Sequence, residues 1–469
     1  MADSILGLPS SKKFADESDR FYNHRRSILH QYPNGKSLLT GILSMLPEEE
    51  TNDSIFLWPE KRYESPKTTL RGTSPGTKTA PSTGDADDGT AADAGATAIT
   101  LDLYFKVAST KDIKRGHVLR VDTDGNLYWV VEVVRGVSAE ATNGYVKVRL
   151  IRAATLGTIA TIFAAGTVVR VVGSAYGEGA AGRGLKATGF KRPYWIQNTT
   201  QIFRDHFDFP RSVLKMGLKY DKSGPYKEKA FDTVVDHMTS IERAILFGKR
   251  STTSRASFDT DQEDLTVRTM SGIIEFLELW DAGSTGLSID GATYAPYAFK
   301  GASTADTDDQ KRIITNAAGT ISVDKFNLWA ERVGRYHTNR SSDKLVLLGN
   351  GALMALVKMF RNNTDFTVRY GEKAYGLTLV IVTTPFGDFN LVTHPLFNED
   401  TTMTYWMLFL DIHYLKYRYL TDSDTRLLKM RQNPGDDFRR DEFLTECGLE
   451  LWTPESHMLV KNVQSYVES

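Results

Sequence analysis

The chain has 469 residues, with 57 lysines and arginines against 58 aspartates and glutamates. Its hydrophobic fraction of 41% and charged fraction of 25% are typical of globular proteins and exclude global disorder. A net charge of −1 argues against a polycationic nucleic-acid binder and a polybasic membrane-surface protein. A single cysteine, Cys447, excludes a disulfide scaffold and any multi-cysteine metal site. With no visible secretory signal and no long apolar run, we expect a soluble protein of a reducing compartment.

The N-terminal part has little regular pattern. Residues 1–35 are charged and aromatic but aperiodic, which indicates an extended arm, and residues 38–46 are spaced as a short amphipathic helix that Pro47 ends. Residues 64–99 consist mostly of Ser, Thr, Gly, Ala, Pro and Asp. Such a segment buries too little apolar surface to offset its ordering entropy, so we expect a flexible loop or one that a partner orders.

Between residues 100 and 190 the hydrophobic period changes to two, which is typical of strands. The turn Asp122-Thr123-Asp124-Gly125 separates two β-rich runs and predicts a hairpin. Further strands are expected at 145–151 and 167–172. We interpret this region as a small β-module inserted between helical parts of the chain.

The longest helical pattern covers residues 225–247. Pro225 suits the first helical position and Gly248 suits the end. One apolar stripe is expected along it, made of Phe231, Val234, Val235, Met238, Ile241 and Ile245. At 1.5 Å per residue such a helix would be roughly 35 Å long and would serve as a scaffold strut.

The final half alternates helices and strands without a regular repeat. Helices are expected at 322–335 and 352–360, and a buried strand at 344–348 precedes the second of them. Further strands are expected near residues 377–383, 389–393, 404–410 and 413–420, and a closing β-pair from residues 443–452 and 458–463. This mixture predicts the α+β class.

Three glycine-containing segments resemble nucleotide-binding motifs. The segment from Gly177 to Gly182 matches the dinucleotide fingerprint, but no helix start follows it, so a hinge is the better interpretation. Gly349-Asn350-Gly351 follows a strand, yet Met354 stands where the third glycine belongs. Gly35-Lys36-Ser37 lacks the leading glycine of a phosphate-binding loop, because His30 occupies that position. None of the three predicts a nucleotide site.

The search for metal ligands and nucleophiles is equally negative. Asp411 and His413 share a face of an expected strand, but a hydrogen bond is the commoner outcome for such a pair. In Gly72-Thr73-Ser74-Pro75-Gly76, Pro75 has no N–H to offer an oxyanion. Cys447 lies in a strand pattern and is expected to pack in a core. The acidic turns at 122–125 and 306–309 lack the spacing of a calcium loop. We therefore assign no catalytic, cofactor-binding or metal-binding residue and expect no enzyme activity and no cofactor.

Several segments resemble the major capsid proteins of tailed bacteriophages with the Hong Kong 97-type fold, in the group that carries a β-module in its extended loop. They occur in the family's order along nearly the whole chain. They are residues 39–43, 56–60, 165–179, 198–203, 242–248, 269–273, 435–436 and 446–450, the second of which reads Phe56-Leu57-Trp58-Pro59-Glu60.

The resemblance implies a division of the chain into five segments. These would be an N-terminal arm with a short helix at 1–58, an extended loop with its β-module at 59–205, a peripheral domain with a spine helix at 206–274, an axial domain at 275–425, and a C-terminal return to the peripheral domain at 426–469. The Lys–Asn crosslink of the family's founding member cannot be placed on this sequence, so a non-covalent shell is expected.

The function that the resemblance implies is structural. Copies of the chain would form hexamers and pentamers of an icosahedral head around double-stranded DNA, which they would contact non-specifically. Portal, scaffolding and decoration proteins would be partners, no membrane would be involved, and the virion would be assembled in the bacterial host cytoplasm. An encapsulin-like compartment shell is the alternative, and a hydrolase or nucleotide-binding enzyme is the least favoured.

Overall fold

The computed structural model describes residues 48–61, 66–71, 76–77, 95–97, 102–110, 112–123, 125–134, 142–152, 154–156, 164–178, 194–215, 225–254, 266–281, 311–335, 343–362, 367–374 and 377–467. The arm and the short helix expected at 38–46 lie outside these residues. The chain divides into two compact units, one formed by Met1–Glu60 with Tyr194–Ser469 and the other by Lys61–Pro193. None of the described helices is long and apolar enough to cross a membrane.

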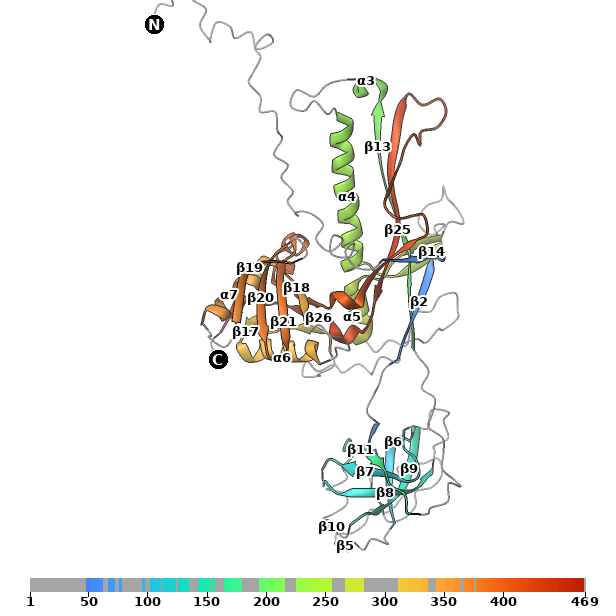
Figure 1. Cartoon of the computed structure of the whole chain (residues 1–469), viewed down its shortest axis with the longest axis vertical. Coiled ribbons are helices and arrows are strands. Elements are labelled where there is room, and N and C mark those ends of the chain that lie inside the picture. The colour runs from blue at the N-terminus through green and yellow to red at the C-terminus, as the bar shows by residue number, and fades with distance from the viewer. Residues whose placement is uncertain are drawn as a thin grey trace, which may run out of the picture. The chain divides into compact units, whose positions relative to one another are not determined.

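One sheet of the first unit supports a long helix. Its strands run in the order β1 (Glu49–Thr51), β23 (Leu415–Leu420), β25 (Phe438–Leu451) and β13 (Gln201–Pro210), with β24 (Arg426–Leu428) also paired to β25. Only the β1–β23 pair among these is parallel. Helix α4 (Pro225–Phe247) runs alongside β13 and contacts both β13 and β25 (Figure 1). The short helix α3 (Arg211–Leu214) follows β13 directly.

Helix α4 begins and ends where the sequence predicts, but its buried face differs from the expected stripe. Ile241 and Ile245 are buried as expected, whereas Phe231 is 49% exposed and Val235 is only partly buried. The remaining buried positions of the helix include polar residues, namely Thr233, His237 and Glu242. A stripe defined by hydrophobicity alone misplaces this face, because buried polar side chains with hydrogen-bond partners also occupy it.

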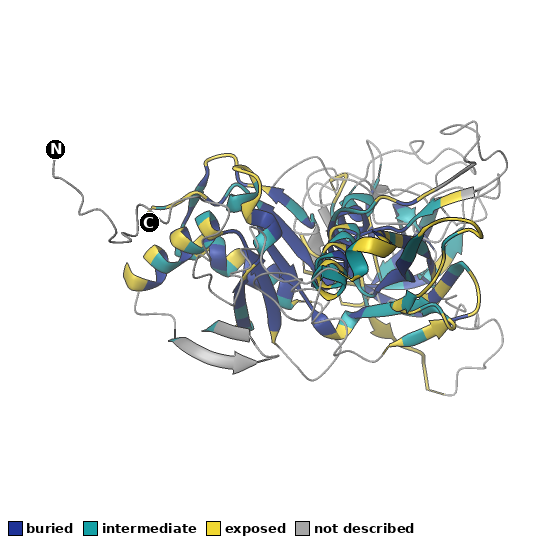
Figure 2. Ribbon diagram, turned by 90° about the horizontal axis from the view of Figure 1, so that it is seen from above, coloured by how far each residue is buried: buried dark blue, intermediate teal, exposed yellow. Residues whose placement is uncertain are grey.

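A second sheet of the first unit has seven strands. Their order is β16 (Ile313–Thr315), β26 (Met458–Lys461), β22 (Met407–Leu410), β18 (Lys344–Leu348), β21 (Gly387–Thr393), β20 (Leu377–Thr384) and β19 (Thr367–Ala374). The helices α6 (Val323–Gly334) and α7 (Asn350–Asn362) supply apolar residues to the core on one face, and β17 (Thr320–Ile321) pairs with β27 (Ser465–Tyr466). Figure 2 shows buried residues along the strands, while the helices carry a mixture of buried and exposed residues.

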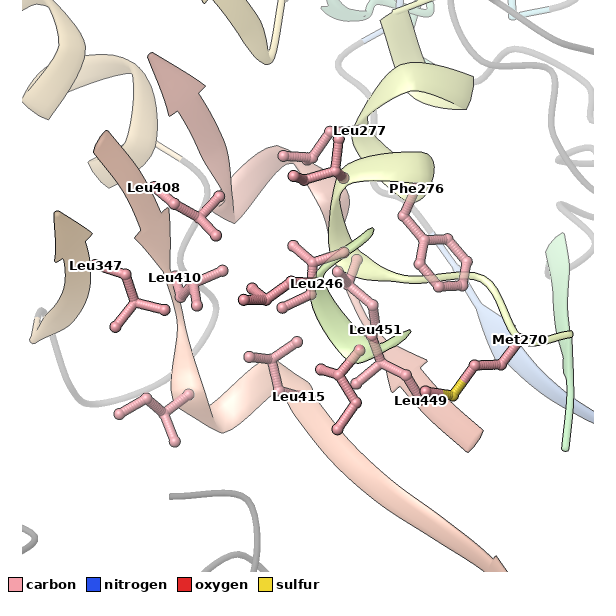
Figure 3. Close-up of a cluster of buried hydrophobic side chains, with 14 of the residues drawn as sticks. Leu246, Met270, Phe276, Leu277, Leu347, Leu408, Leu410, Leu415, Leu449 and Leu451 are labelled. Carbon is pink, nitrogen blue, oxygen red and sulfur yellow. The ribbon is translucent and has the colours of Figure 1, made fainter. Parts of the chain in front are cut away.

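Both faces of this seven-stranded sheet are covered. In β18, Val346 and Leu348 belong to the core shared with α6 and α7, while Leu345 and Leu347 belong to a second core. The second core joins the sheet to the end of α4 and to α5 (Ile273–Asp281), and Figure 3 shows Leu246, Leu410 and Leu451 within it. A strand buried on both faces reads as a continuous apolar run, as this one does.

The β-pair expected at the C-terminal end is wrong. β25 pairs with β13, β23 and β24, whereas β26 pairs with β16 and β22 of the other sheet. The connection between them contains Thr453, whose φ is 46°, and the 3₁₀ turn η5 (Pro454–Ser456). Met458, Leu459 and Val460 are all buried, so this strand requires cover on both faces, which the two cores of the seven-stranded sheet supply.

The described part of the first unit also contains five short elements. The strands β14 (Ser251–Ser254) and β15 (Thr266–Thr269) form an antiparallel pair, and three further 3₁₀ turns are η2 (Pro395–Asn398), η3 (Met403–Tyr405) and η4 (Ile412–Tyr414). The strand expected at 413–420 therefore begins at Leu415, after η4.

The second unit is the expected β-module. Its seven antiparallel strands are ordered β3 (Lys67–Thr69), β11 (Val168–Ser174), β7 (His117–Val121), β8 (Leu127–Val134), β9 (Thr142–Leu150), β6 (Leu103–Ser109) and β4 (Gly76–Thr77). The predicted β7–β8 hairpin is confirmed, and Gly125 in its turn has a φ of 69°, which glycine adopts readily. β5 (Gly95–Thr97) pairs separately with β10 (Ala154–Leu156).

The expectation that residues 64–99 cannot order themselves within their own chain is wrong for the parts described. β3, β4 and β5 all come from this segment and pair with strands of the module. Leu70 is 2% exposed and belongs to the module core. Backbone pairing to strands of a ready apolar core compensates for the poor composition of the segment itself.

Candidate assembly surface

The two strands that carry the chain out of the first unit and back form a ribbon. β2 (Ile55–Glu60) pairs antiparallel with β12 (Tyr194–Thr199), and the segment between them is the β-module. On the inner face of the ribbon Phe56 and Trp58 are 6% and 1% exposed. Their rings stack with centroids 5.9 Å apart, and Trp58 meets Phe276 of α5 edge-on at 6.1 Å. The inner face is therefore fixed in the core of the first unit.

The outer face of the ribbon is apolar and exposed. Leu57 is 49% exposed and Trp195 is 52% exposed. The register places Trp195 opposite Pro59 and Gln197 opposite Leu57, so Leu57, Pro59 and Trp195 share one face as diagonal or direct neighbours. We refer to these three residues as the outer strip. Exposed, contiguous apolar residues that include a tryptophan are typical of interaction sites.

A glycine allows the ribbon to lie against β25. A Cβ atom at Gly448 would come 2.7 Å from the ring of Phe56 and 3.0 Å from the carbonyl oxygen of Thr199. Contacts this close to a backbone atom cannot be relieved by a rotamer change. Any larger residue at position 448 would push the ribbon away from the sheet.

Buried hydrogen bonds fix the ribbon at both of its ends. Asn198 is fully buried and its amide donates to the carbonyl oxygens of Ser271 and Leu449 at 3.1 and 2.7 Å, while its Oδ1 accepts from the Ser271 N–H at 2.9 Å. Glu60 accepts from the Thr453 N–H at 2.7 Å, and the Thr200 hydroxyl donates to Glu446 at 2.6 Å. A buried polar group that loses its hydrogen-bond partner destabilises the folded chain. These bonds therefore fix the orientation of the ribbon relative to the first unit.

Helix α4 is fixed to both sheets by histidine–carboxylate pairs. His237 is fully buried and its ring nitrogens lie 2.7 Å from an Asp205 oxygen of β13 and 2.8 Å from the Thr445 hydroxyl of β25. Glu242 lies 2.7 Å from the Nε2 of His394, and both side chains are buried. The first pair links α4 to the five-stranded sheet, and the second links it to the segment that follows β21.

The Asp411–His413 pair considered from the sequence does not form a metal site. Asp411 is buried and its carboxylate pairs with Lys344, whereas His413 is exposed and only its backbone N–H donates to Asp411. His457 lies beside this pair, where its Nδ1 accepts from the Asp411 N–H at 3.2 Å and its Nε2 lies 3.3 Å from the Trp452 carbonyl oxygen. Burial lowers the pKa of His457 to about 4, so this ring is neutral at pH 7.

The Gly349-Asn350-Gly351 turn has a packing role. A Cβ at Gly349 would lie 2.3 Å from the Thr404 carbonyl oxygen. The first N–H groups of α7 already have protein acceptors, since Asn350 N–H donates to Asn398 Oδ1 at 2.8 Å and Gly351 N–H to Thr404 Oγ1 at 3.2 Å. Close packing and these hydrogen bonds account for Gly349 and Gly351, so the turn does not require a bound phosphate.

The other sequence motifs do not assemble a reactive site within the described residues. Cys447 is buried in β25 as expected, and burial raises the pKa of its thiol to about 12. Across the described ranges, no group of three His, Cys, Asp or Glu side chains could hold a metal ion. Residues 35–37, 72–75, 179–182 and 306–309 lie outside the described part of the chain.

The chain thus has a long strut helix, two packed sheets and an anchored ribbon that carries an inserted β-module, the α+β elements that the resemblance to Hong Kong 97-type capsid proteins predicts. The chain belongs to the SU10 major capsid protein family, whose model matches residues 27–464. It is therefore a major capsid protein, and its function in the virion is structural.

Comparison with solved structures gives distant matches. The chain of Mycobacterium phage Bobi is 7% identical, with 98% of each chain covered and a TM-score of 0.38. Mycobacterium phage Patience is 10% identical over 62% of this chain and 76% of that one, also with a TM-score of 0.38. The holo-SrpI encapsulin complex from Synechococcus elongatus PCC 7942 is 10% identical over 59% and 77%, with a TM-score of 0.36. No curated protein matches the sequence.

The sequence predicts which segments belong to this surface, but it does not predict which of their side chains are exposed. Residues 56–60 and 198–203 were singled out by resemblance, and they contain Trp58, Asn198 and Thr200. The outer strip was missed because Ile-Phe-Leu-Trp-Pro is apolar at every position, so alternation does not show which face is exposed. The one usable signal is the pair Tyr194-Trp195 directly after Pro193, where the chain returns to the first unit.

Proposed function

We propose that copies of this capsid protein form the hexamers and pentamers of an icosahedral phage head, and that the outer strip of the ribbon is a contact between adjacent copies. The observation that carries the proposal is the contrast between the two faces of the ribbon. Phe56 and Trp58 are buried in the subunit's own core, while Leu57 and Trp195 on the opposite face are about half exposed. A partner surface would complete the burial of this second face.

The rigidity of the ribbon favours such a contact. Glu60 at one end of the ribbon and Asn198 and Thr200 at the other already hold it through buried hydrogen bonds, so docking orders little additional backbone. Covering Leu57 and Trp195 would contribute roughly 1 to 2 kcal/mol each by the area rule. A weak contact of this size, repeated in every copy of a closed shell, is enough to make assembly cooperative.

Other parts of the proposal follow from family membership and the charge balance. The enclosed double-stranded DNA would be contacted non-specifically, and a net charge of −1 lets the subunits approach one another without strong mutual repulsion. Portal, scaffolding and decoration proteins would be further partners, and assembly would take place in the bacterial host cytoplasm. Residues 206–274 would belong to the peripheral domain and 275–425 to the axial domain, with 1–58, 59–205 and 426–469 as arm, extended loop and C-terminal return.

The proposal is tested by polar substitutions on the outer strip. Leu57→Ser and Trp195→Ser should leave the unassembled chain folded, because both side chains are half exposed, and should strongly reduce the yield of shells in sedimentation velocity. Met354→Ser is the matched control, since Met354 is 64% exposed on α7 and lies outside the strip. Shell yields equal to wild type for both strip variants would contradict the assigned contact, and a wild-type chain that stays monomeric would contradict shell formation itself.

A further inference from the structure

The buried pair of Lys344 and Asp411 joins two neighbouring strands of the seven-stranded sheet. β18 and β22 are antiparallel, and their register pairs Leu345 with Leu410. Lys344, the first residue of β18, therefore lies opposite Asp411, which directly follows β22. The two side chains are 1% and 2% exposed, and Nζ of the lysine contacts Oδ2 of the carboxylate. The two residues are 67 positions apart in the sequence, so a bond between them would close a long segment of the chain.

The ammonium of Lys344 has few acceptors for so buried a position. An ammonium carries three N–H donors. Among the described residues the structure gives Nζ of Lys344 one acceptor, which is Oδ2 of Asp411. In the strand on the other side of β18 the register places Phe389 beside Lys344, and Phe389 is fully buried in the core shared with α6 and α7. A buried ion pair with few further hydrogen bonds carries a large desolvation penalty.

The carboxylate of Asp411 is held in one orientation. Its Oδ1 accepts from the N–H of His413 at 3.2 Å. The backbone N–H of Asp411 donates to Nδ1 of His457 at 3.2 Å, and Nε2 of that ring lies 3.3 Å from the Trp452 carbonyl oxygen. Burial lowers the pKa of His457 to about 4, so the ring is neutral at pH 7 and adds no charge beside the pair. These contacts leave Oδ2 as the oxygen that faces the lysine.

We propose that Lys344 and Asp411 condense to an amide within each copy of the folded chain, with a bond from Nζ of the lysine to Cγ of the aspartate. The ion pair is the form in which the chain folds, and the amide accumulates afterwards. Shell formation is not required, because both residues belong to one copy. Each subunit remains a separate chain, so the amide is compatible with a non-covalent shell.

The condensation needs no other reactant. A proton passes from Nζ to Oδ2 along their hydrogen bond, which gives an uncharged amine and a carboxylic acid, the forms that burial favours. The lone pair of Nζ attacks Cγ of Asp411, and the charge that develops on Oδ1 is stabilised by the N–H of His413. The bond from Cγ to Oδ2 breaks as a second proton moves from Nζ to Oδ2. One ammonium and one carboxylate thus become one amide and one water molecule.

The buried site favours the product. A secondary amide has one N–H where the ammonium has three, so fewer buried donors need acceptors. Oδ1 becomes the amide oxygen and can still accept from the N–H of His413. Both charges disappear, which removes their desolvation penalty. Since the two side chains are almost fully buried, bulk water is kept from the bond and hydrolysis is opposed.

The β-module contains a matched lysine–aspartate pair that differs in burial. Nζ of Lys147 lies 2.8 Å from Oδ2 of Asp102, but these side chains are 22% and 27% exposed. Water solvates both ions there, and ions at such a site contribute little by pairing. We expect the exposed pair to remain an ion pair, so it serves as an internal control for the effect of burial.

Mass spectrometry of the full-length chain tests the proposal. Samples of the folded protein, taken at intervals and then denatured, should convert to a main species that is lighter by one water molecule. Trypsin should no longer cleave that species after Lys344, and the peptide map should show Lys344 joined to Asp411. The map is essential, because a succinimide at Asp124-Gly125 or Asp290-Gly291 would lose the same mass.

Two variants separate the amide from other modifications. Asp411→Asn should release ammonia instead of water and reach the same final mass as reacted wild type, because both chains give the same amide. Lys344→Met combined with Asp411→Leu should fold with an apolar pair and keep its full mass. If Asp411→Asn does not fold, the wild-type map decides.

Three results would overturn the proposal. The first is a wild-type mass that stays unchanged through prolonged incubation of the folded chain. The second is a loss of water that maps entirely to other residues. The third is an equal extent of linkage between Lys147 and Asp102, because burial would then not drive the reaction.

Discussion

The two compact units of this capsid protein bury different kinds of side chains. The described part of the β-module has a core cluster of thirteen apolar residues and one fully buried charged side chain, Lys106, while its clearest charge cluster, Asp102 with Lys147 and Arg149, lies partly exposed outside that core. The first unit buries ion pairs and histidines, among them Lys344–Asp411 and His394–Glu242, at exposures of 2% or less.

Chain connectivity accounts for part of this difference. Two neighbouring strand pairs of the module, β7–β8 and β8–β9, are joined by short connections, so apolar alternation is enough to set their register. The first unit joins segments that are remote in sequence, and Glu242 meets His394 across 152 residues. Apolar surfaces alone would tolerate several arrangements of such segments, whereas a buried polar pair tolerates one. The polar pairs therefore give specificity to the first unit at some cost in stability.

The largest expected effect comes from splitting a buried pair. Lys344→Met leaves Asp411 as an unpaired carboxylate in the core and should lower the free energy of unfolding by about 3 to 5 kcal/mol. Lys344→Met combined with Asp411→Leu should recover most of this loss, as measured by urea denaturation of the unassembled chain. A double variant as unstable as the single one would show that the pair contributes stability rather than specificity.

Acid should affect the first unit before the module. His457 has a folded pKa of about 4 against 6.5 for the free side chain, so the unfolded chain takes up this proton first as the pH falls. The contribution to stability is therefore complete above pH 6.5, declines between 6.5 and 4, and amounts to about 3 kcal/mol. When the unfolding free energy is plotted against pH over this range, the part of the slope due to His457 should be absent in His457→Gln. An unchanged slope would exclude His457 as its source.

A cavity in the module should leave the first unit intact. Val121→Ala removes two methyl groups from a fully buried position and should lower the unfolding free energy of the module by roughly 2 kcal/mol. Hydrogen exchange should then rise in residues 102–174 and stay at wild-type level in α4 and β25. A parallel rise in both units would mean that they unfold as one and would remove the basis of the comparison.

The smallest expected effect concerns the charges outside the module core. The hydrogen bond from Arg149 holds the pKa of Asp102 below its usual value, so this contribution is present at neutral pH and is lost only as the pH falls through that lowered pKa. Asp102→Ala should cost about 1 kcal/mol or less at pH 7, because the cluster is partly solvated. Thermal melting would detect a larger loss, which would place the cluster among the stabilising contacts of the module.

Local features of the fold were accessible from the sequence. The limits of α4 followed from Pro225 and Gly248, and the β7–β8 hairpin followed from its Asp-Gly turn, because these signals act over a few residues. The partners of β25 and β26 were not accessible, since pairing depends on which apolar faces remain uncovered after the chain has folded back.

The candidate surface was harder to predict for a related reason. The identities of Leu57 and Trp195 alone do not show whether an apolar residue is exposed or buried in the folded chain. His237 and Glu242 on the buried face of α4 likewise look like surface residues until their partners are in place. Exposure and pairing are properties of the folded chain, and the sequence shows only which residues could take part.

Cryo-electron microscopy of the expressed full-length chain tests the central claim most directly. The account predicts closed shells in which Leu57 and Trp195 of each copy are buried against an adjacent copy, while Phe56 and Trp58 stay in the subunit's own core. Monomers at high concentration, or shells in which the outer strip faces solvent in every copy, would contradict it.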